Sequence, residues 1–110
     1  MLEVQTLSAR RTVSLEELER LASDGIVEAG QVLPPDPDAT HATFESVSGE
    51  YRASIPLGMA RVQGRILLEE GALRLRVEEG DTLCWNVKDL ERIRYTVGKE
   101  PDSVPENPPH

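Results

Sequence analysis

The clearest periodic pattern in the chain is a short amphipathic helix near its start. Four apolar residues recur there at helical spacing, namely Leu15, Leu18, Leu21 and Ala22. Ser14 stands at the N-cap position, and Glu17 stands where the capping box places its acidic partner, able to reach back to the Ser14 amide. Gly25 suits the left-handed residue that follows a helix. The pattern predicts a helix over residues 15–23.

Alternating apolar and polar positions predict two β-hairpins in the middle of the chain. The first joins residues 40–47 to residues 51–55 around Gly49, and the second joins residues 65–69 to residues 72–78 around Gly71. In the last of these segments the apolar residues Leu73, Leu75 and Val77 alternate with Arg74 and Arg76. This alternation predicts a strand with one buried side and one solvent-facing side.

Weaker patterns fill in the rest of the chain. They predict an edge strand at residues 2–7, a short strand at 26–33, one helical turn at 57–62, a short turn or helix at 85–90, and a strand at 92–97 with Ile93, Tyr95 and Val97 on one side. The proline-rich residues 34–38 predict a stiff surface linker. Five or six strands with one clear N-terminal helix predict an α+β fold of mostly short antiparallel strands and hairpins. Residues 1–97 form the expected single domain, and residues 98–110 form a proline-rich flexible tail.

Charge and cysteine content exclude several classes of protein. The net charge is −8, with 20 acidic against 12 basic residues, and the arginines are interleaved with glutamates, so we expect no binding to nucleic acid or to anionic membranes. A single cysteine excludes an intramolecular disulfide and a cysteine-rich zinc site. No signal sequence and no run of about 20 apolar residues is present, so the expected location is the cytoplasm.

Several segments, in order along the chain, resemble the molybdopterin-binding domain of sulfite oxidase-type oxidoreductases. Residues 38–46 (DATHATFES) and 49–57 (GEYRASIPL) resemble that family's most characteristic stretch. Residues 72–77 (ALRLRV) resemble one of its strands, and residues 84–93 (CWNVKDLERI) resemble the segment that helps to hold the pterin phosphate. Residues 12–18 (TVSLEEL) are similar to the helix near the start of that domain. The resemblance implies a fold like that of the molybdopterin domain.

The departures from the family pattern bear on function. The family's molybdenum-binding cysteine lies in a loop after the first helix, and residues 25–34 of this chain contain no cysteine. Cys84 stands where the family usually has a glycine, so the resemblance does not make it a metal ligand. Lys88 matches one of two family lysines near the pterin phosphate. We therefore expect no catalytic residues, no metal ligands and no bound cofactor.

The expected function is that of a non-catalytic remnant of the oxidoreductase domain, retained as a binding or interaction module that is not an enzyme by itself. One alternative is a binder of a pterin or another small anion through Lys88, Arg74 and Arg76. Another alternative is a homo-oligomeric structural module, because the exposed edge strands of a small sheet tend to pair or to be covered. A protein partner that completes a site would be the only route to catalysis.

The remaining arginines, histidine, cysteine and paired glutamates could each have a functional role or a purely structural one. Arg74, Arg76, Arg92 and Arg94 alternate on two predicted strands, and they would form an anion-binding cluster if those strands were neighbours. Ion pairs with Glu69, Glu78 and Glu91 are the alternative. We expect His41 to be a surface or half-buried side chain, Cys84 to be a small core residue, and the pairs Glu69–Glu70 and Glu78–Glu79 to be solvated turn residues.

Overall fold

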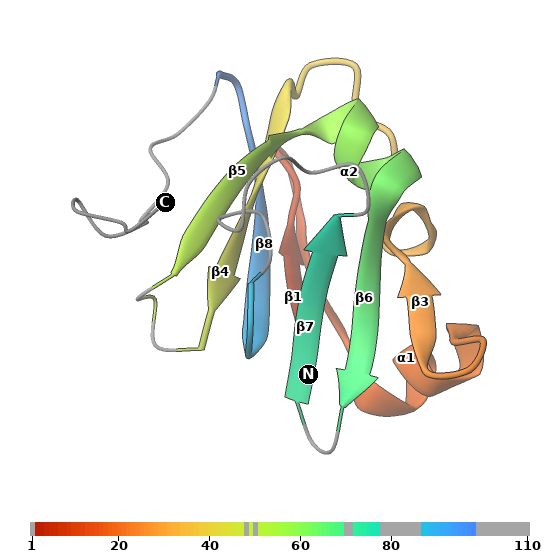
Figure 1. Cartoon of the computed structure of the whole chain (residues 1–110). Coiled ribbons are helices and arrows are strands. Elements are labelled where there is room, and N and C mark those ends of the chain that lie inside the picture. Colours follow the sequence, from red (N-terminus) through yellow and green to blue (C-terminus); the bar gives the residue numbers. More distant parts are fainter. Residues whose placement is uncertain (1, 48, 50, 70–71, 78–86, 99–110) are drawn as a thin grey trace.

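Two β-sheets pack against each other through apolar inner faces (Figure 1). The computed structural model describes residues 2–47, 49, 51–69, 72–77 and 87–98. The strands in these ranges are β1 (Leu2–Gln5), β2 (Arg10–Val13), β3 (Ile26–Glu28), β4 (His41–Ser46), β5 (Arg52–Pro56), β6 (Gly64–Glu69), β7 (Ala72–Val77) and β8 (Leu90–Thr96). The helices are α1 (Leu15–Leu21) and α2 (Leu57–Gln63), with a 3-10 turn, η1 (Ala29–Gln31). The α+β class and the predominance of antiparallel strands are as predicted.

The larger sheet has five strands in the order β2-β1-β8-β4-β5. All its neighbours are antiparallel except β1 and β8, which run parallel. The predicted hairpin of residues 40–47 and 51–55 is confirmed as β4 and β5. The prediction of an edge strand at residues 2–7 is wrong in its placement, because β1 lies between two strands and buries Leu2 and Val4. The edge is β2, whose sequence RRTV lacks the alternation that marks a strand.

The smaller sheet has three strands in the order β3-β6-β7. Its β6–β7 hairpin is the second predicted hairpin, and Leu75 and Val77 of β7 are buried as the alternation requires. Val87 forms an isolated antiparallel bridge to Leu75 on the outer edge of β7. Residues 26–33, predicted as one short strand, divide into β3 and the 3-10 turn η1.

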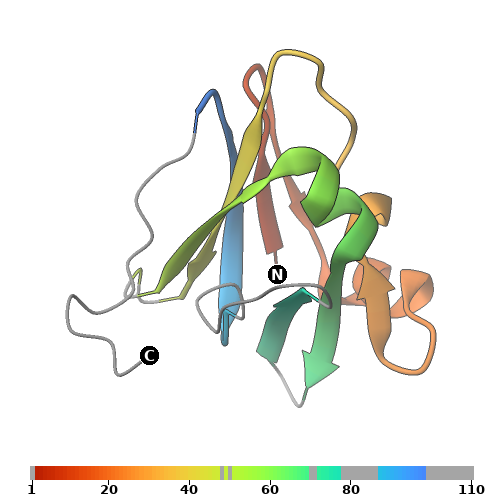
Figure 2. The ribbon, with the colours of Figure 1, turned by 45° about the horizontal axis from the view of Figure 1, so that its top comes forward.

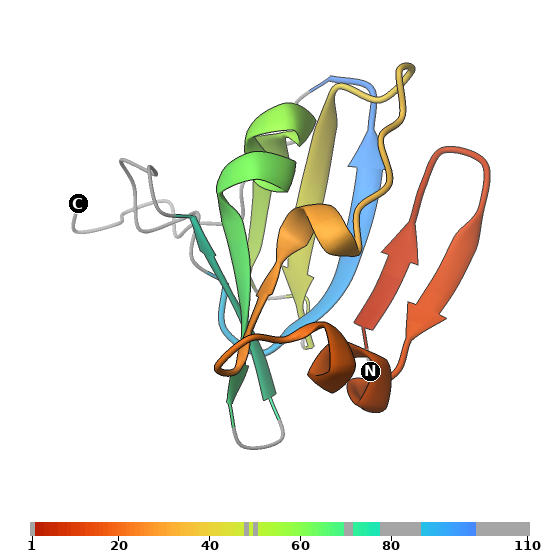
Figure 3. The ribbon, with the colours of Figure 1, turned by 90° about the vertical axis from the view of Figure 1, so that its right-hand side faces the viewer.

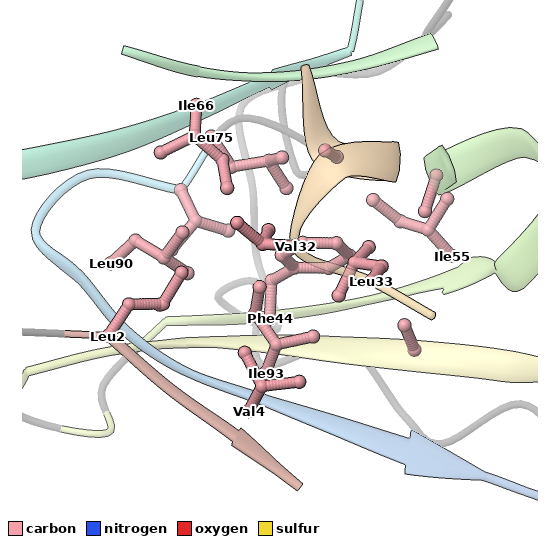
Figure 4. Close-up of a cluster of buried hydrophobic side chains, with 14 of the residues drawn as sticks. Leu2, Val4, Val32, Leu33, Phe44, Ile55, Ile66, Leu75, Leu90 and Ile93 are labelled. Atoms are coloured by element: carbon pink, nitrogen blue, oxygen red, sulfur yellow. The ribbon is translucent and has the colours of Figure 1, made fainter. Parts of the chain in front are cut away.

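The core lies between the two sheets (Figure 4). Ile66 and Leu75 from the smaller sheet lie on one side of Val32 in this cluster, and Phe44 of β4 and Ile93 of β8 lie on the other. Helix α2 links β5 to β6 at one end of the sheets (Figures 2 and 3). It spans seven residues, which is longer than the single turn predicted for residues 57–62. Its Leu57 and Ala60 are buried, so α2 closes that end of the core.

Helix α1 begins as the capping pattern predicts and ends differently. The Glu17 amide donates to Ser14 Oγ at 3.1 Å, while the Glu17 carboxylate accepts from Arg11 Nη2 at 3.0 Å and does not bond back to Ser14. The helix ends at Leu21, two residues before the predicted end. Gly25 does not terminate it. Gly25 and Asp24, with φ of 76° and 54°, form the centre of a tight turn that leads into β3.

Several expectations fall outside the described residues. These are the predicted turn and helix residues 80–81 and 85–86, Cys84, the acidic residues Glu70, Glu78 and Glu79, and the tail beyond Gly98. The division of the chain at residue 97 therefore stays a prediction. Within the described ranges, neither helix combines the length and the apolar character that crossing a bilayer requires.

Candidate anion-binding surface

Strand β7 directs Arg74 and Arg76 to the outer face of the three-stranded sheet. Leu73, Leu75 and Val77 turn inward to the core, so the two arginines between them must face outward. Arg76 is exposed and Arg74 is half-buried. The predicted orientation of these arginines is confirmed.

Lys88 joins the two arginines through a backbone bridge. The Leu75 amide donates to the Val87 carbonyl at 2.8 Å, and the Val87 amide donates to the Leu75 carbonyl at 3.2 Å. In this antiparallel register Lys88, which is exposed, follows Val87 on the side of Leu75 that carries Arg74. All three residues that the sequence singled out for anion binding thus lie along one edge of the smaller sheet. We call Arg74, Arg76 and Lys88 the cationic edge.

Sequence reasoning missed a fourth cation beside the cationic edge. Arg65 of β6 is the direct cross-strand partner of Arg76, and like charges in this arrangement repel. Other groups offset this repulsion: Arg65 Nη1 donates to the carbonyls of Val62 and Gly64 at 3.1 Å each, and Arg65 Nη2 lies 3.8 Å from Glu28 Oε1. These carbonyls lie at the C-terminal end of α2, where the helix dipole attracts a cation. The β6–β7 pairing register was the signal that would have revealed Arg65.

The Nε of Arg74 is in an ion pair with Glu69 but makes no hydrogen bond in the described part of the chain. Its Nε lies 3.5 Å from Glu69 Oε1, so the predicted ion pair with Glu69 exists. The same Nε is buried and makes no hydrogen bond within the described part of the chain. An ion pair between partly exposed side chains contributes about 1 kcal/mol or less. A ligand anion could therefore displace Glu69 at little cost.

Among the described residues on the outer face of the smaller sheet, cations outnumber carboxylates. Arg65 and the cationic edge contribute four positive charges, against Glu28 and Glu69 on the described part of that face. The net charge of these groups is +2, while the whole chain carries −8. The surface is thus suited to a small anion rather than to a long polyanion, which the net charge of −8 would repel.

The other two arginines of the predicted cluster lie elsewhere. Arg92 and Arg94 belong to β8, at the centre of the five-stranded sheet, so they do not share a face with Arg74 and Arg76. A joint four-arginine cluster is therefore ruled out. Arg92 and Arg94 pair with Glu45 at 3.5 and 2.9 Å, and Arg92 also pairs with Glu3 at 3.7 Å, instead of with Glu91.

The remaining candidates for chemistry are few. His41 is half-buried, as predicted, and its Nδ1 lies 2.8 Å from Thr40 Oγ1. No group of three or more metal-binding side chains comes together in the described ranges. Comparisons of the chain with protein-family models, curated proteins and solved structures found no match.

Proposed function

We propose that the chain is a non-catalytic binding module that recognises a small anionic ligand, such as a pterin phosphate, through the cationic edge. The observation that carries this proposal is the convergence of Arg74, Arg76 and Lys88 at one sheet edge by means of the Val87 bridge. Lys88 follows Arg76 by twelve positions in the sequence, and the Val87–Leu75 bridge holds Val87, the residue before Lys88, against β7.

The geometry matches the chemistry of phosphate recognition. Arg74 and Arg76 are two residues apart on one strand, which separates their Cα atoms by about 6.5–7 Å. Each guanidinium offers paired donors to oxygen anions, and a lysine adds a mobile point charge.

The proposal includes an evolutionary relation to the molybdopterin-binding domain without its catalysis. The ordered resemblance of residues 38–57, 72–77 and 84–93 supports it, and so does the absence of cysteine from residues 25–34. Elemental analysis of protein purified from molybdenum-replete cells tests this part, with a substoichiometric metal content as the expected result. One molybdenum per chain would overturn it. A cytoplasmic location and the absence of nucleic-acid binding also stay predictions.

Titration calorimetry with pyrophosphate and with a pterin monophosphate tests the binding function. A charged hydrogen bond contributes about 1.5–3 kcal/mol, so Arg74→Ala and Arg76→Ala should each weaken binding by roughly tenfold or more. Lys88→Ala should weaken it by a smaller factor. Arg20→Ala, on the exposed side of α1, is the matched control and should bind like the unmodified protein. Equal affinities across all four variants would refute the assignment.

Self-association through sheet edges is a weaker alternative. The edge strand β2 carries the exposed residues Arg10 and Arg11, and the edge strand β5 ends in Pro56, which cannot donate a ladder hydrogen bond. Both features discourage edge-to-edge pairing. Light scattering at high protein concentration should therefore report a monomer, and a stable dimer would favour the homo-oligomeric module instead.

A further inference from the structure

The outer face of the three-stranded sheet has an apolar end beside the cationic edge. Ile26 of β3, Leu67 of β6 and Arg74 of β7 are direct partners across the three strands, so their side chains form one row. The backbone bridge to β7 places Lys88 opposite Arg74 and extends the row by one position. The row therefore carries two apolar side chains at one end and two cations at the other. We call Ile26 and Leu67 the apolar pair.

The apolar pair is accessible to a ligand. Val27 and Ile66, which alternate with the pair along β3 and β6, are buried in the core, so the pair faces outward. Ile26 is 38% exposed and Leu67 is half-buried. A single exposed apolar residue is ordinary on a protein surface, but these two adjoin each other and border the cations of the proposed ligand site. An apolar group attached to a bound anion would cover them and release the water at their surface.

A neighbouring row of side chains fixes the direction in which such a ligand would lie. Glu28, Arg65 and Arg76 are cross-strand partners on the same face, two residues along from the first row. Glu28 lies beside Ile26 at the apolar end, and its Oε1 is 3.8 Å from Arg65 Nη2. Arg76 lies beside Arg74 at the other end and is exposed. The carboxylate of Glu28 disfavours an anion at the apolar end, so the anionic group belongs at the cationic edge.

We propose that the ligand of the cationic edge is an amphiphilic anion whose compact apolar group lies on Ile26 and Leu67. This inference rests on the proposed anion binding and specifies the class of ligand. Neighbouring strands are about 4.8 Å apart, so the apolar pair suits a single ring or a short branched alkyl group rather than a long acyl chain. A ring has a further advantage, because guanidinium groups such as that of Arg74 stack on aromatic faces. An aryl phosphate combines the anionic and aromatic groups that this row of side chains suits.

Titration calorimetry with methyl phosphate and phenyl phosphate tests the proposal. The titrations are run at about pH 8, above the second pKa of a phosphate monoester, which is about 6, so the two probes carry the same charge and differ in their organic group. We expect phenyl phosphate to bind about tenfold more tightly, which corresponds to covering roughly 50–60 Å² of apolar surface. Titrations at several temperatures should also give phenyl phosphate the more negative heat-capacity change of binding, because that change reports apolar burial.

Two substitutions locate the apolar contact. Ile26→Thr and Leu67→Thr keep a strand-favouring residue while removing apolar surface, and each should reduce the preference for phenyl phosphate to about threefold or less without changing the affinity for methyl phosphate. Ile26 is exposed, so its variant keeps the test available if Leu67→Thr lowers stability. Val97→Thr is the matched control, because Val97 is 72% exposed and follows β8 of the other sheet. It should retain the tenfold preference.

The outcomes distinguish a failure of this inference from a failure of the proposed anion binding. Equal affinities for the two monoesters in the unmodified protein, with binding that Arg76→Ala still weakens, would overturn the apolar contact and leave the anion site in place. A tenfold preference that persists in both Ile26→Thr and Leu67→Thr would overturn the apolar contact as well. Absence of binding by either monoester would remove the anion site and this inference with it.

Discussion

At the scale of single residues, Gly64 is the most crowded of the described glycines. It joins α2 to β6, and a Cβ there would collide with the Ala60 carbonyl oxygen and come within 3.1 Å of the Ala29 Cβ. Both neighbours belong to the packed core and cannot move freely.

We predict that Gly64→Ala lowers the free energy of unfolding by about 1–3 kcal/mol, the usual cost of overpacking. Gly58 is the matched control, because it lies in α2 with nothing within 4 Å of an added Cβ. Gly58→Ala should raise the free energy of unfolding by about 0.5–1 kcal/mol through helix propensity. Urea denaturation measures both. Equal effects of the two substitutions would contradict the assigned packing.

Tyr95 holds the proline-rich linker against the five-stranded sheet. Its hydroxyl donates to the Pro34 carbonyl at 2.6 Å, and Arg61 Nε donates to the neighbouring Leu33 carbonyl at 2.8 Å. Burial raises the pKa of Tyr95 from 10.0 to about 12, although the charge of Arg61 acts in the opposite direction. The native state therefore favours the neutral phenol.

The pKa of Tyr95 predicts how stability depends on alkaline pH. The pKa of Tyr95 is higher in the folded state than in the unfolded state. The contribution of its neutral phenol to the free energy of unfolding is therefore complete below pH 10.0 and is lost as pH rises from 10.0 to about 12. Tyr95→Phe should remove this alkaline slope and cost about 1 kcal/mol at neutral pH through the lost hydrogen bond. Denaturation at a series of pH values measures both effects. The exposed Tyr51 provides the control, and Tyr51→Phe should leave the slope intact.

At the scale of elements, α1 depends on its cap because it has only seven residues. Isolated helices of this length are not stable in water, so the cap and the burial of Leu18 must hold it. We predict that Ser14→Ala lowers the free energy of unfolding by about 1 kcal/mol. Ser14→Asp, which preserves an acceptor, should cost much less. Thermal denaturation compares them, and an unaffected Ser14→Ala variant would show that the cap is unimportant.

The elements that the sequence predicted well are those with local partners. The hairpins β4–β5 and β6–β7 could be predicted because alternation and a glycine at the turn act within a few residues. The parallel pairing of β1 with β8 joins residues about ninety positions apart, and no local pattern encodes it. This pairing also explains the misplaced edge, since β1 could be recognised as interior only once β8 was placed beside it.

The candidate site was predictable only in part for the same reason. The outward direction of Arg74 and Arg76 follows from period-two alternation in one strand. Their separation from Arg92 and Arg94 depends on which sheet each strand joins, which is a long-range property. The ion-pair partners Glu3 and Glu45 escaped sequence reasoning because they lie far along the chain from Arg92.

At the scale of the whole molecule, the two sheets of an acidic chain carry different charged features on their outer sides. The outer face of the smaller sheet carries the cationic edge, and the outer face of the larger sheet carries the ion pairs of Glu3 and Glu45 with the arginines of β8. We attribute ligand binding to the cationic edge of the smaller sheet.

Mapping of amide chemical shifts during a titration with pterin monophosphate tests ligand binding at the cationic edge most directly. We predict saturable shifts that centre on residues 72–77 and on Val87 and Lys88, with little change across β4, β5 and β8. The shifts should vanish in the combined variant Arg74→Ala and Arg76→Ala. An unchanged spectrum, or shifts centred on the five-stranded sheet, would contradict the proposed site.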